Sequence, residues 1–317
     1  MNPARLSLLI ALSLVPLALA SLFWEPALLR SVAVRDPALA RTMLIELRLP
    51  RTALALLIGA SLGLGGAAMQ GLLRNPLASP DVLGPSTGAS LGAVIAGYFL
   101  GGGTLAIAAG GITGALIALG LLLALAGPAA TTATLVLAGV AISALGGALV
   151  NLALSLAPSP YALYDVMFWL LGSLADRSLP QLAIAGPIIV AAGAAVLSRA
   201  PALDSLALGE DVAESLGVDV RRLRWTIVVA TGIMVGAGVA VAGSIGFIGL
   251  VVPHLVRPLV GNRPGAALLP SALAGAALLV CADMAVRIPV GGQELKLGVL
   301  TALIGAPFFL WLVVKGR

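Results

Sequence analysis

The stretch LGAVIAGYFLGGGTLAIAAGGITGALIALGLLLALA, residues 91–126, contains no charged side chain, and the uncharged run around it extends from Val82 to Tyr164. Across the whole chain, 60% of residues are hydrophobic, 10% are charged and the mean hydropathy is +1.11. A soluble domain cannot cover that much apolar surface with so few polar side chains. The sequence therefore predicts an all-α polytopic membrane protein.

Apolar runs separated by charged, Gly-rich or Pro-rich breaks predict ten membrane spans. A span needs about 20 apolar residues to cross a hydrocarbon core of roughly 30 Å, so ten spans leave only short loops. The expected spans lie near residues 5–24, 52–72, 82–100, 104–126, 133–156, 179–198, 225–243, 246–260, 267–286 and 297–314. No stretch resembles a soluble domain, and we expect residues 1–317 to form a single transmembrane domain.

Two of these spans carry alternatives. Residues 1–20 have a basic residue, an apolar run and a cleavage-like Ala-Leu-Ala, as a signal peptide would. We favour a retained first span because many further spans follow. In the eighth span Pro253, His254 and Arg257 crowd the end, where a broken helix or a re-entrant segment is the alternative.

An even number of spans puts both termini on one side, which we expect to be the cytoplasm. This topology places ten of the 18 Lys and Arg residues inside and eight outside, a weak positive-inside bias. The bias is weak because the first external segment, from Arg30 to Arg51, holds five arginines. Those arginines need an explanation of their own.

Several function classes are excluded by what the chain lacks. The single cysteine, Cys281, and the single histidine, His254, are too few for a disulfide or a His/Cys metal cluster, so both are expected to be packing residues. Basic residues are scattered rather than clustered with aromatics, which argues against nucleic acid. The only lysines, Lys296 and Lys315, lie outside any phosphate-cradling GxxxxGK[ST] loop, so the chain does not hydrolyse ATP itself. No catalytic set indicates an enzyme.

Gradient-driven transport is also disfavoured by the residues present. Ion-coupled carriers usually need an ionisable group at membrane depth, and the one good candidate here is Asp283. Arg287 lies one helical turn away, which predicts a paired structural charge instead. Sodium bound by backbone carbonyls remains an open alternative.

A charged stretch interrupts the apolar pattern at residues 208–224, LGEDVAESLGVDVRRLR, where seven of 17 residues are charged. Leu208, Val212 and Leu216 recur on one helical face, and Gly217 is expected to end that helix. Two short amphipathic helices in an internal loop would make a docking surface. The alternative is a solvated loop with a basic stop signal at the membrane edge.

The second of these short helices is expected to begin at Asp219, whose side chain is placed to cap it. Its arginines then lead into the next span. Small residues at helical spacing, as in Gly59-Ala-Ser-Leu-Gly63 and Gly232-Ile-Met-Val-Gly236, predict close helix packing within the chain rather than a dimer face.

Several ordered motifs together resemble the FecCD-type permease subunits of ATP-binding-cassette importers for ferric siderophores, haem and cobalamin. The match runs from about residue 46 to the C-terminus. It rests on RLPRT (48–52), GAAMQGLLRNPLASPDVLGPSTGAS (66–90), LALGEDVAESLGVDVRRLR (206–224), GFIGLVVPHLVRPLVG (246–261), LLPSALAGAALLVCADMAVR (268–287) and TALIGAPFFLWL (301–312). Two departures are Lys296, where the family commonly has ELPxG, and Asn262-Arg263 in place of His-Arg.

The resemblance implies a bacterial inner-membrane protein with ten helices and both termini cytoplasmic. Two permease copies, here expected to be a homodimer, would work by alternating access. Two ATPase subunits would hold the ATP and Mg²⁺ below, and a periplasmic binding protein would deliver substrate from above. The chain itself would bind no cofactor or metal. Its residues do not distinguish siderophore, haem and cobalamin, nor a homodimer from a heterodimer.

The resemblance also implies site residues. Segment 206–224 would couple to the ATPase, chiefly through Leu208, Gly209, Glu210, Val212, Leu216 and Gly217. Arg48, Arg51 and Arg287 would receive glutamates of the binding protein. The fifth span would line the pathway, with Thr131, Thr132, Ser143 and Asn151 as its polar or gate residues. The competing classes are a stand-alone secondary transporter or channel, and a scaffold with no transport role.

Overall fold

The computed structural model describes residues 2–24, 26–127, 131–289 and 294–315, and every regular element within them is helical. The long helices are α1 (Pro3–Leu22), α4 (Leu49–Leu72), α6 (Thr104–Ala126), α7 (Thr132–Ser155), α9 (Leu179–Leu197), α12 (Val220–Ala242), α14 (Pro264–Val286) and α15 (Leu297–Lys315). The short ones are α2 (Pro26–Arg35), α3 (Pro37–Thr42), α5 (Pro85–Val94), α8 (Pro160–Leu170), α10 (Ala200–Leu206), α11 (Glu210–Ser215) and α13 (Ile248–Val256).

Among the described residues there are also two π-helical and two 3₁₀ segments. The π-helical turns η1 (Met43–Arg48) and η3 (Ile95–Phe99) continue neighbouring α-helices, and the 3₁₀ turns are η2 (Pro80–Leu83) and η4 (Arg257–Val260). Helices α3, η1 and α4 run on without a break, so residues 37–72 form one helical rod.

Seven helices among the described residues are long and apolar enough to cross a membrane. They are the rod of residues 37–72 and α1, α6, α7, α9, α12 and α14. The other three expected spans are also helical: α5 with η3, α13 with η4, and α15, of which Leu297–Phe308 is counted as a shorter apolar helix. The all-helical membrane fold is thus confirmed, and the count of ten spans stays a prediction.

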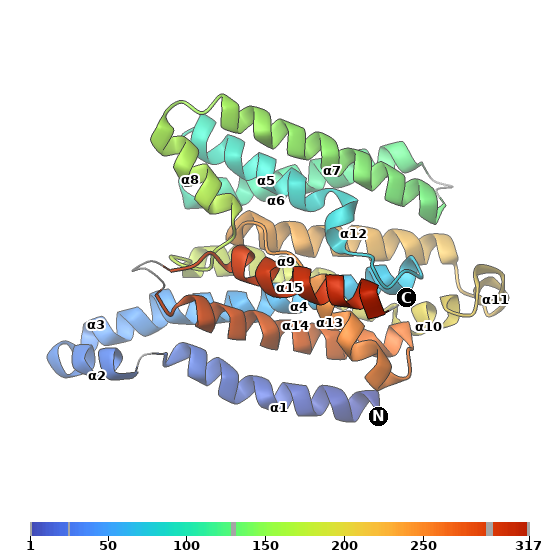
Figure 1. The fold of residues 1–317 in the computed structure, drawn as a ribbon, viewed down its shortest axis with the longest axis horizontal. Coiled ribbons are helices and arrows are strands. Elements are labelled where there is room, and N and C mark those ends of the chain that lie inside the picture. Colours follow the sequence, from blue (N-terminus) through green and yellow to red (C-terminus); the bar gives the residue numbers. More distant parts are fainter. Residues whose placement is uncertain (1, 25, 128–130, 290–293, 316–317) are drawn as a thin grey trace.

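The helices lie roughly side by side, so the molecule has two ends (Figure 1). One end carries α10, α11 and both chain termini, and we call it the α11 end. The opposite end carries α2, α3 and α8, and we call it the α2 end. Helix α4 contacts α14, α13, α9 and α12, whereas α5, α6 and α7 form a group along one flank.

The central packing depends on glycines, as the sequence predicts. A Cβ added at Gly59 would lie 2.4 Å from the carbonyl oxygen of Gly275, and one at Gly63 would lie 2.1 Å from that of Ser271. The backbones of α4 and α14 therefore touch, which only small residues allow. Gly236 likewise faces Ala115 of α6, so both glycine pairs pack within the chain.

The short helices of the charged stretch differ from the expected ones. Helix α11 ends as predicted, but the second helix expected at Asp219 is simply the first turn of α12, which runs unbroken from Val220 to Ala242. No residue in that first turn interrupts a helix, so the cap at Asp219 starts the span itself. The structure has another short helix, α10, immediately before α11. Its residues Leu203 and Leu206 are buried against the bundle.

Candidate functional site

The α11 end presents the charged stretch as a compact helical turn. Gly209 and Gly217 have φ angles of +120° and +83°, a region that side chains with a Cβ rarely adopt. The amide of Val218 donates to the carbonyl of Ala213 at 3.0 Å, which closes α11 as predicted for a glycine-terminated helix. Asp219 then accepts from the amide of Arg222 at 2.8 Å and caps α12.

An apolar patch lies on the outside of this turn. The side chains of Leu208, Val212 and Leu216 are 66%, 43% and 61% exposed, whereas Ala213 on the opposite face of α11 is fully buried. Three large apolar side chains exposed at a polar, charged end of a membrane protein form a surface that another protein could cover. The predicted face therefore exists, and its role as a docking surface stays a prediction.

Glu210 points back toward the bundle rather than outward. Its carboxylate lies 3.1 Å from the guanidinium of Arg224 on α12 and 3.8 Å from that of Arg74, which follows α4. Glu210 thus fixes the position of α11 against the spans. This partnership was not expected from the sequence, because neither arginine is a helical neighbour of Glu210.

A buried ion cluster joins three helices near the α2 end. Asp283 of α14 is fully buried, and its carboxylate accepts the Nε–H of Arg51 at 3.0 Å and the Nε–H of Arg287 at 3.0 Å. Arg287 also donates to the carbonyl of Ser21 at 2.7 Å, and Ser21 shares a hydrogen bond of 3.0 Å with Thr52. The pairing of Asp283 with Arg287 is confirmed, and Arg51 joins it as a second partner.

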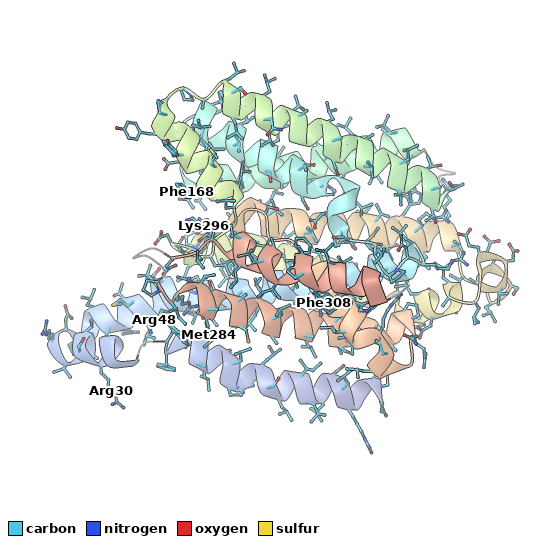
Figure 2. All side chains as sticks on the ribbon, in the orientation of Figure 1. Arg30, Arg48, Phe168, Met284, Lys296 and Phe308 are labelled. Carbon is cyan, nitrogen blue, oxygen red and sulfur yellow. The ribbon has the colours of Figure 1, made fainter. Side chains whose placement is uncertain are left out.

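The three arginines expected to dock a partner are therefore already engaged within the chain. Arg51 and Arg287 are only 15% and 8% exposed. Arg48 donates to the carbonyls of Leu22 and Trp24 at 3.2 and 2.5 Å, and so lies against the end of α1. By contrast, Arg30 on α2 points away from the bundle (Figure 2).

Even so, these arginines border an open polar hollow of about 230 Å³. Its lining includes two residues that the sequence interpretation missed, Arg177 and Glu294. Glu294 lies 3.3 Å from Arg51 and is 45% exposed, so it covers the outer edge of that guanidinium. Burial lowers the pKa of Arg177, which lies just before α9. The four arginines of the hollow outnumber Asp176, Glu294 and the buried Asp283 beneath them by one positive charge.

Lys296 lies beside α8. Its ammonium group is 5.5 Å from the ring centre of Phe168, a cation–π distance (Figure 2). The following amide of Leu297 donates to the carbonyl of Gly172 at 3.0 Å. A backbone hydrogen bond thus attaches the start of α15 to the residues that follow α8, and Lys296 adds a side-chain contact with α8.

Helix α7 presents the polar residues predicted for a pathway at different depths. Thr131 caps the helix by accepting from the amide of Thr134 at 3.2 Å, and Thr132 is half-buried. Ser143 donates to the carbonyl of Asp81 in η2 at 3.3 Å, whereas Asn151 is exposed. The four residues thus do not converge into one site.

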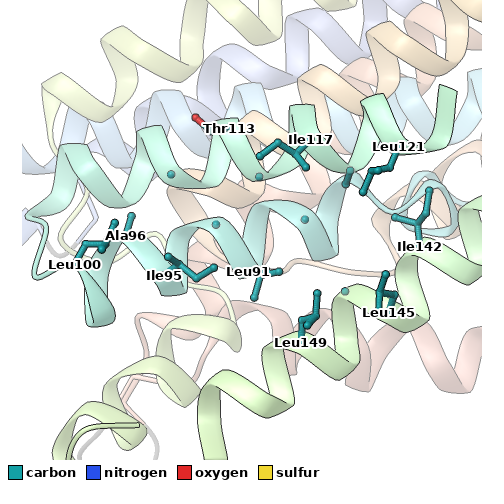
Figure 3. A pocket seen from close by; sticks show the side chains of 16 residues that line it. Leu91, Ile95, Ala96, Leu100, Thr113, Ile117, Leu121, Ile142, Leu145 and Leu149 are labelled. Carbon is teal, nitrogen blue, oxygen red and sulfur yellow. The ribbon is translucent and has the colours of Figure 1, made fainter. Parts of the chain in front are cut away.

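A groove of about 390 Å³ runs between α5, α6 and α7. Figure 3 shows Leu91 of α5, Ile95 of η3, Ile117 of α6 and Leu145 of α7 around it. Its lining is almost entirely apolar, with glycines where α5 and α6 touch. This side of α7 is therefore loosely packed.

The described residues hold no group of three His, Cys, Asp or Glu that could bind a metal. His254 packs edge-on against Phe308, with ring centres 6.0 Å apart, as expected of a packing residue. Cys281 is exposed on α14, so its expected role in packing is wrong: α14 buries the faces that carry Gly275, Leu279 and Asp283 instead.

Comparison with known proteins agrees with this geometry. The model of the FecCD transport family matches residues 7–315. The vitamin B12 import system permease protein BtuC of Vibrio cholerae is 42% identical over 286 residues, covering 88% of this chain and 85% of that protein. BtuC of Citrobacter koseri is 44% identical over 278 residues, covering 86% and 83%.

A solved structure has the same fold. It shows an inward-facing conformation of a metal-chelate type ABC transporter, with a TM-score of 0.88 and 32% sequence identity. The superposition covers 98% of this chain and 99% of that one.

Proposed function

Because the chain belongs to the FecCD transport family, we propose that it is the transmembrane subunit of an ATP-driven importer that takes up cobalamin or a related metal chelate. The observation that carries this proposal is 42–44% identity to vitamin B12 permeases over at least 85% of the chain. These relatives are permeases rather than enzymes, and ATP hydrolysis belongs to a separate subunit.

The proposal assigns the two ends of the bundle to two partners. The α11 end faces the cytoplasm, with both termini there, and the exposed face of Leu208, Val212 and Leu216 inserts into a cleft of the ATPase. Apolar side chains gain free energy on leaving water, about 25 cal/mol per Å² buried, so this patch supports such docking. The chain is then a multi-pass protein of the bacterial inner membrane.

The α2 end receives a periplasmic binding protein. Arg51 and Arg287 are held in place by Asp283, so they present fixed positive charge at the rim of the polar hollow. Fixed charges guide an acidic partner without losing conformational freedom on binding. Glu294 lies in the path of an incoming carboxylate and would move aside.

Two copies form the translocation path, with α7 of each facing the other. The support is the exposure of apolar side chains along α7, among them Leu137, Leu145 and Leu152. A wall of this kind offers weak contacts, which suit passage better than retention. We also propose that each copy has ten spans: the seven long apolar helices together with α5, α13 and α15.

The first experiment is purification of the tagged chain in mild detergent, with identification of accompanying proteins. We expect an ATPase subunit at equal stoichiometry in the wild type, and at least a tenfold loss of it in Leu208→Asp/Val212→Asp. Glu214→Lys is the matched control, because it changes the charge at an exposed position of α11 on the face opposite Val212. Equal recovery of the ATPase in all three proteins would refute the docking face.

The substrate is tested in liposomes that contain the assembled complex and ATP. Uptake of radiolabelled cobalamin, unaffected by excess ferric siderophore or haem, is the expected result. Inhibition by either competitor would reassign the substrate. Uptake by the chain alone with an ion gradient and no ATP would instead favour the secondary transporter.

A further inference from the structure

Helices α4 and α14 behave as one rigid body because their backbones touch along much of their length. A Cβ at Gly275 would lie 2.3 Å from the carbonyl oxygen of Gly59, just as one at Gly63 would lie 2.1 Å from that of Ser271. No flexible side chain separates the two helices at these points. A sliding or tilting of one against the other would break close contacts, so they move together.

At the α11 end this pair is attached to the helix that precedes α11. Asp204 of α10 accepts the amide of Gly265 at 2.8 Å and the guanidinium of Arg263 at 2.6 Å. Arg263 occupies the cap position of α14 but its side chain makes no capping hydrogen bond. Asp204 thus supplies the cap from another helix, and its charge also suits the positive end of the helix dipole.

The fit of α10 on α14 is tight at the same place. A Cβ at Gly265 would lie 2.0 Å from the carbonyl oxygen of Ala200, so α10 rests directly on the first turn of α14. Asp204 is 19% exposed and its bond to the amide of Gly265 is partly buried, whereas Arg263 is 66% exposed, so the amide bond is the better shielded of the two. A displacement of α10 is therefore transmitted to α14.

At the α2 end the same two helices are tied again. Asp283 of α14 binds Arg51 of α4 directly, and Arg287 extends the tie to α1 through Ser21. The two ties lie at opposite ends of the one rigid pair. The pair thus spans from the coupling segment to the polar hollow.

We propose that the α4–α14 pair is a strut that transmits movement between the α11 end and the α2 end, and that Asp204 is the positioning residue that attaches the coupling segment to it. This inference rests on the proposed function, in which the two ends meet the ATPase and the binding protein. The alternative attachment, Glu210 to α12, consists of side-chain ion pairs of a 43% exposed carboxylate, whereas Asp204 also binds a backbone amide of α14 at a point where the two backbones touch.

The test uses the complete complex in lipid nanodiscs, with the ATPase subunit and binding protein recovered with the wild-type chain, and cyanocobalamin as the probe. ATP hydrolysis is measured without and with the loaded binding protein. In Asp204→Ala we expect the ATPase to remain bound and basal hydrolysis to stay within twofold, while at least four fifths of the stimulation by the binding protein is lost. Ser205→Ala is the matched control, because this neighbour of Asp204 donates only to the carbonyl of Pro201 within α10 and not to α14, and it should keep most of the stimulation.

Asp204→Asn guards against a variant that fails to assemble, because the amide keeps the size of the side chain and one oxygen for Gly265. It should lose the ion pair and about half of the stimulation. Full stimulation in an assembled Asp204→Ala complex, or in Asp204→Asn where the alanine variant does not assemble, would overturn the strut. A wild-type chain that recruits no ATPase would refute the proposed function instead.

Discussion

Helices α4 and α7 are both 24 residues long, both rich in Ala, Gly and Leu, and both almost free of charge, yet they have opposite surroundings. In the most apolar window of the rod that contains α4, 78% of residues are buried, against 22% for α7. Composition and hydropathy do not distinguish these two helices. What distinguishes them is where the small residues lie relative to a neighbour.

In α4 the glycines face backbones of other helices. A Cβ at Gly66 would lie 1.8 Å from the carbonyl oxygen of Gly249 in α13. In α7, by contrast, Gly147 has nothing within 4 Å, and large side chains such as Leu137 are exposed. Helix α4 is thus surrounded by other helices of the same chain. Helix α7 has an apolar face that no other helix of the described residues covers.

The largest expected effect comes from removing the anchor of α4 at the α2 end. Asp283→Asn leaves Arg51 and Arg287 without the fully buried carboxylate that they share. Breaking a buried ion pair in this way costs about 3–5 kcal/mol of the free energy of unfolding. Thermal unfolding in detergent measures the loss. Glu294→Gln is the control, since this exposed partner of Arg51 should contribute less than about 1 kcal/mol, and equal losses would contradict the assignment.

A smaller effect is expected from a matched pair of glycine substitutions. Gly66→Ala inserts a methyl group where a carbonyl oxygen already lies, which should destabilise the chain by about 1–3 kcal/mol. Gly147→Ala fills open space and should stabilise α7 by up to about 1 kcal/mol through helix propensity. The midpoint of thermal unfolding of the two variants gives the comparison directly. If both lowered it equally, the contrast between α4 and α7 would not hold.

The smallest effect concerns the polar contact that ties α7 to its neighbour. Ser143→Ala removes the hydrogen bond to the carbonyl of Asp81, which is long at 3.3 Å. A hydrogen bond of this kind contributes about 0.5–1.5 kcal/mol. The unfolding midpoint should therefore shift only slightly. A loss as large as that of Asp283→Asn would mean that α7 is held more firmly than its exposure suggests.

Hydropathy located the helices of this fold because it is a local property of the chain. Each of the ten expected spans overlaps a helix, with most ends within a few residues. The short helix α10 was not predicted because seven residues are too few for a hydropathy pattern. Its buried residues Leu203 and Leu206 are held by tertiary contacts, which the local sequence does not show. Gly217 and Asp219 were predictable because their roles depend on adjacent backbone alone.

The candidate sites divide in the same way. The ion pair of Asp283 with Arg287 follows from a spacing of four residues. The participation of Arg51, the inward direction of Glu210 and the cap from Asp204 depend on partners far along the chain, and no local pattern contains them. The resemblance assigns Arg48, Arg51 and Arg287 to docking, which stays a prediction, and it contains nothing of the contacts that these arginines make within the chain.

The Arg51–Asp283 contact also sets an order for biosynthesis. The two residues are 232 positions apart, so at about 5–20 residues per second the ribosome needs about 10–50 s to supply the second after the first. During that interval α4 is already in the membrane with an unneutralised guanidinium at its end. Until α14 arrives, only water and lipid headgroups can solvate this charge, so the end of α4 gains its buried partner late in synthesis.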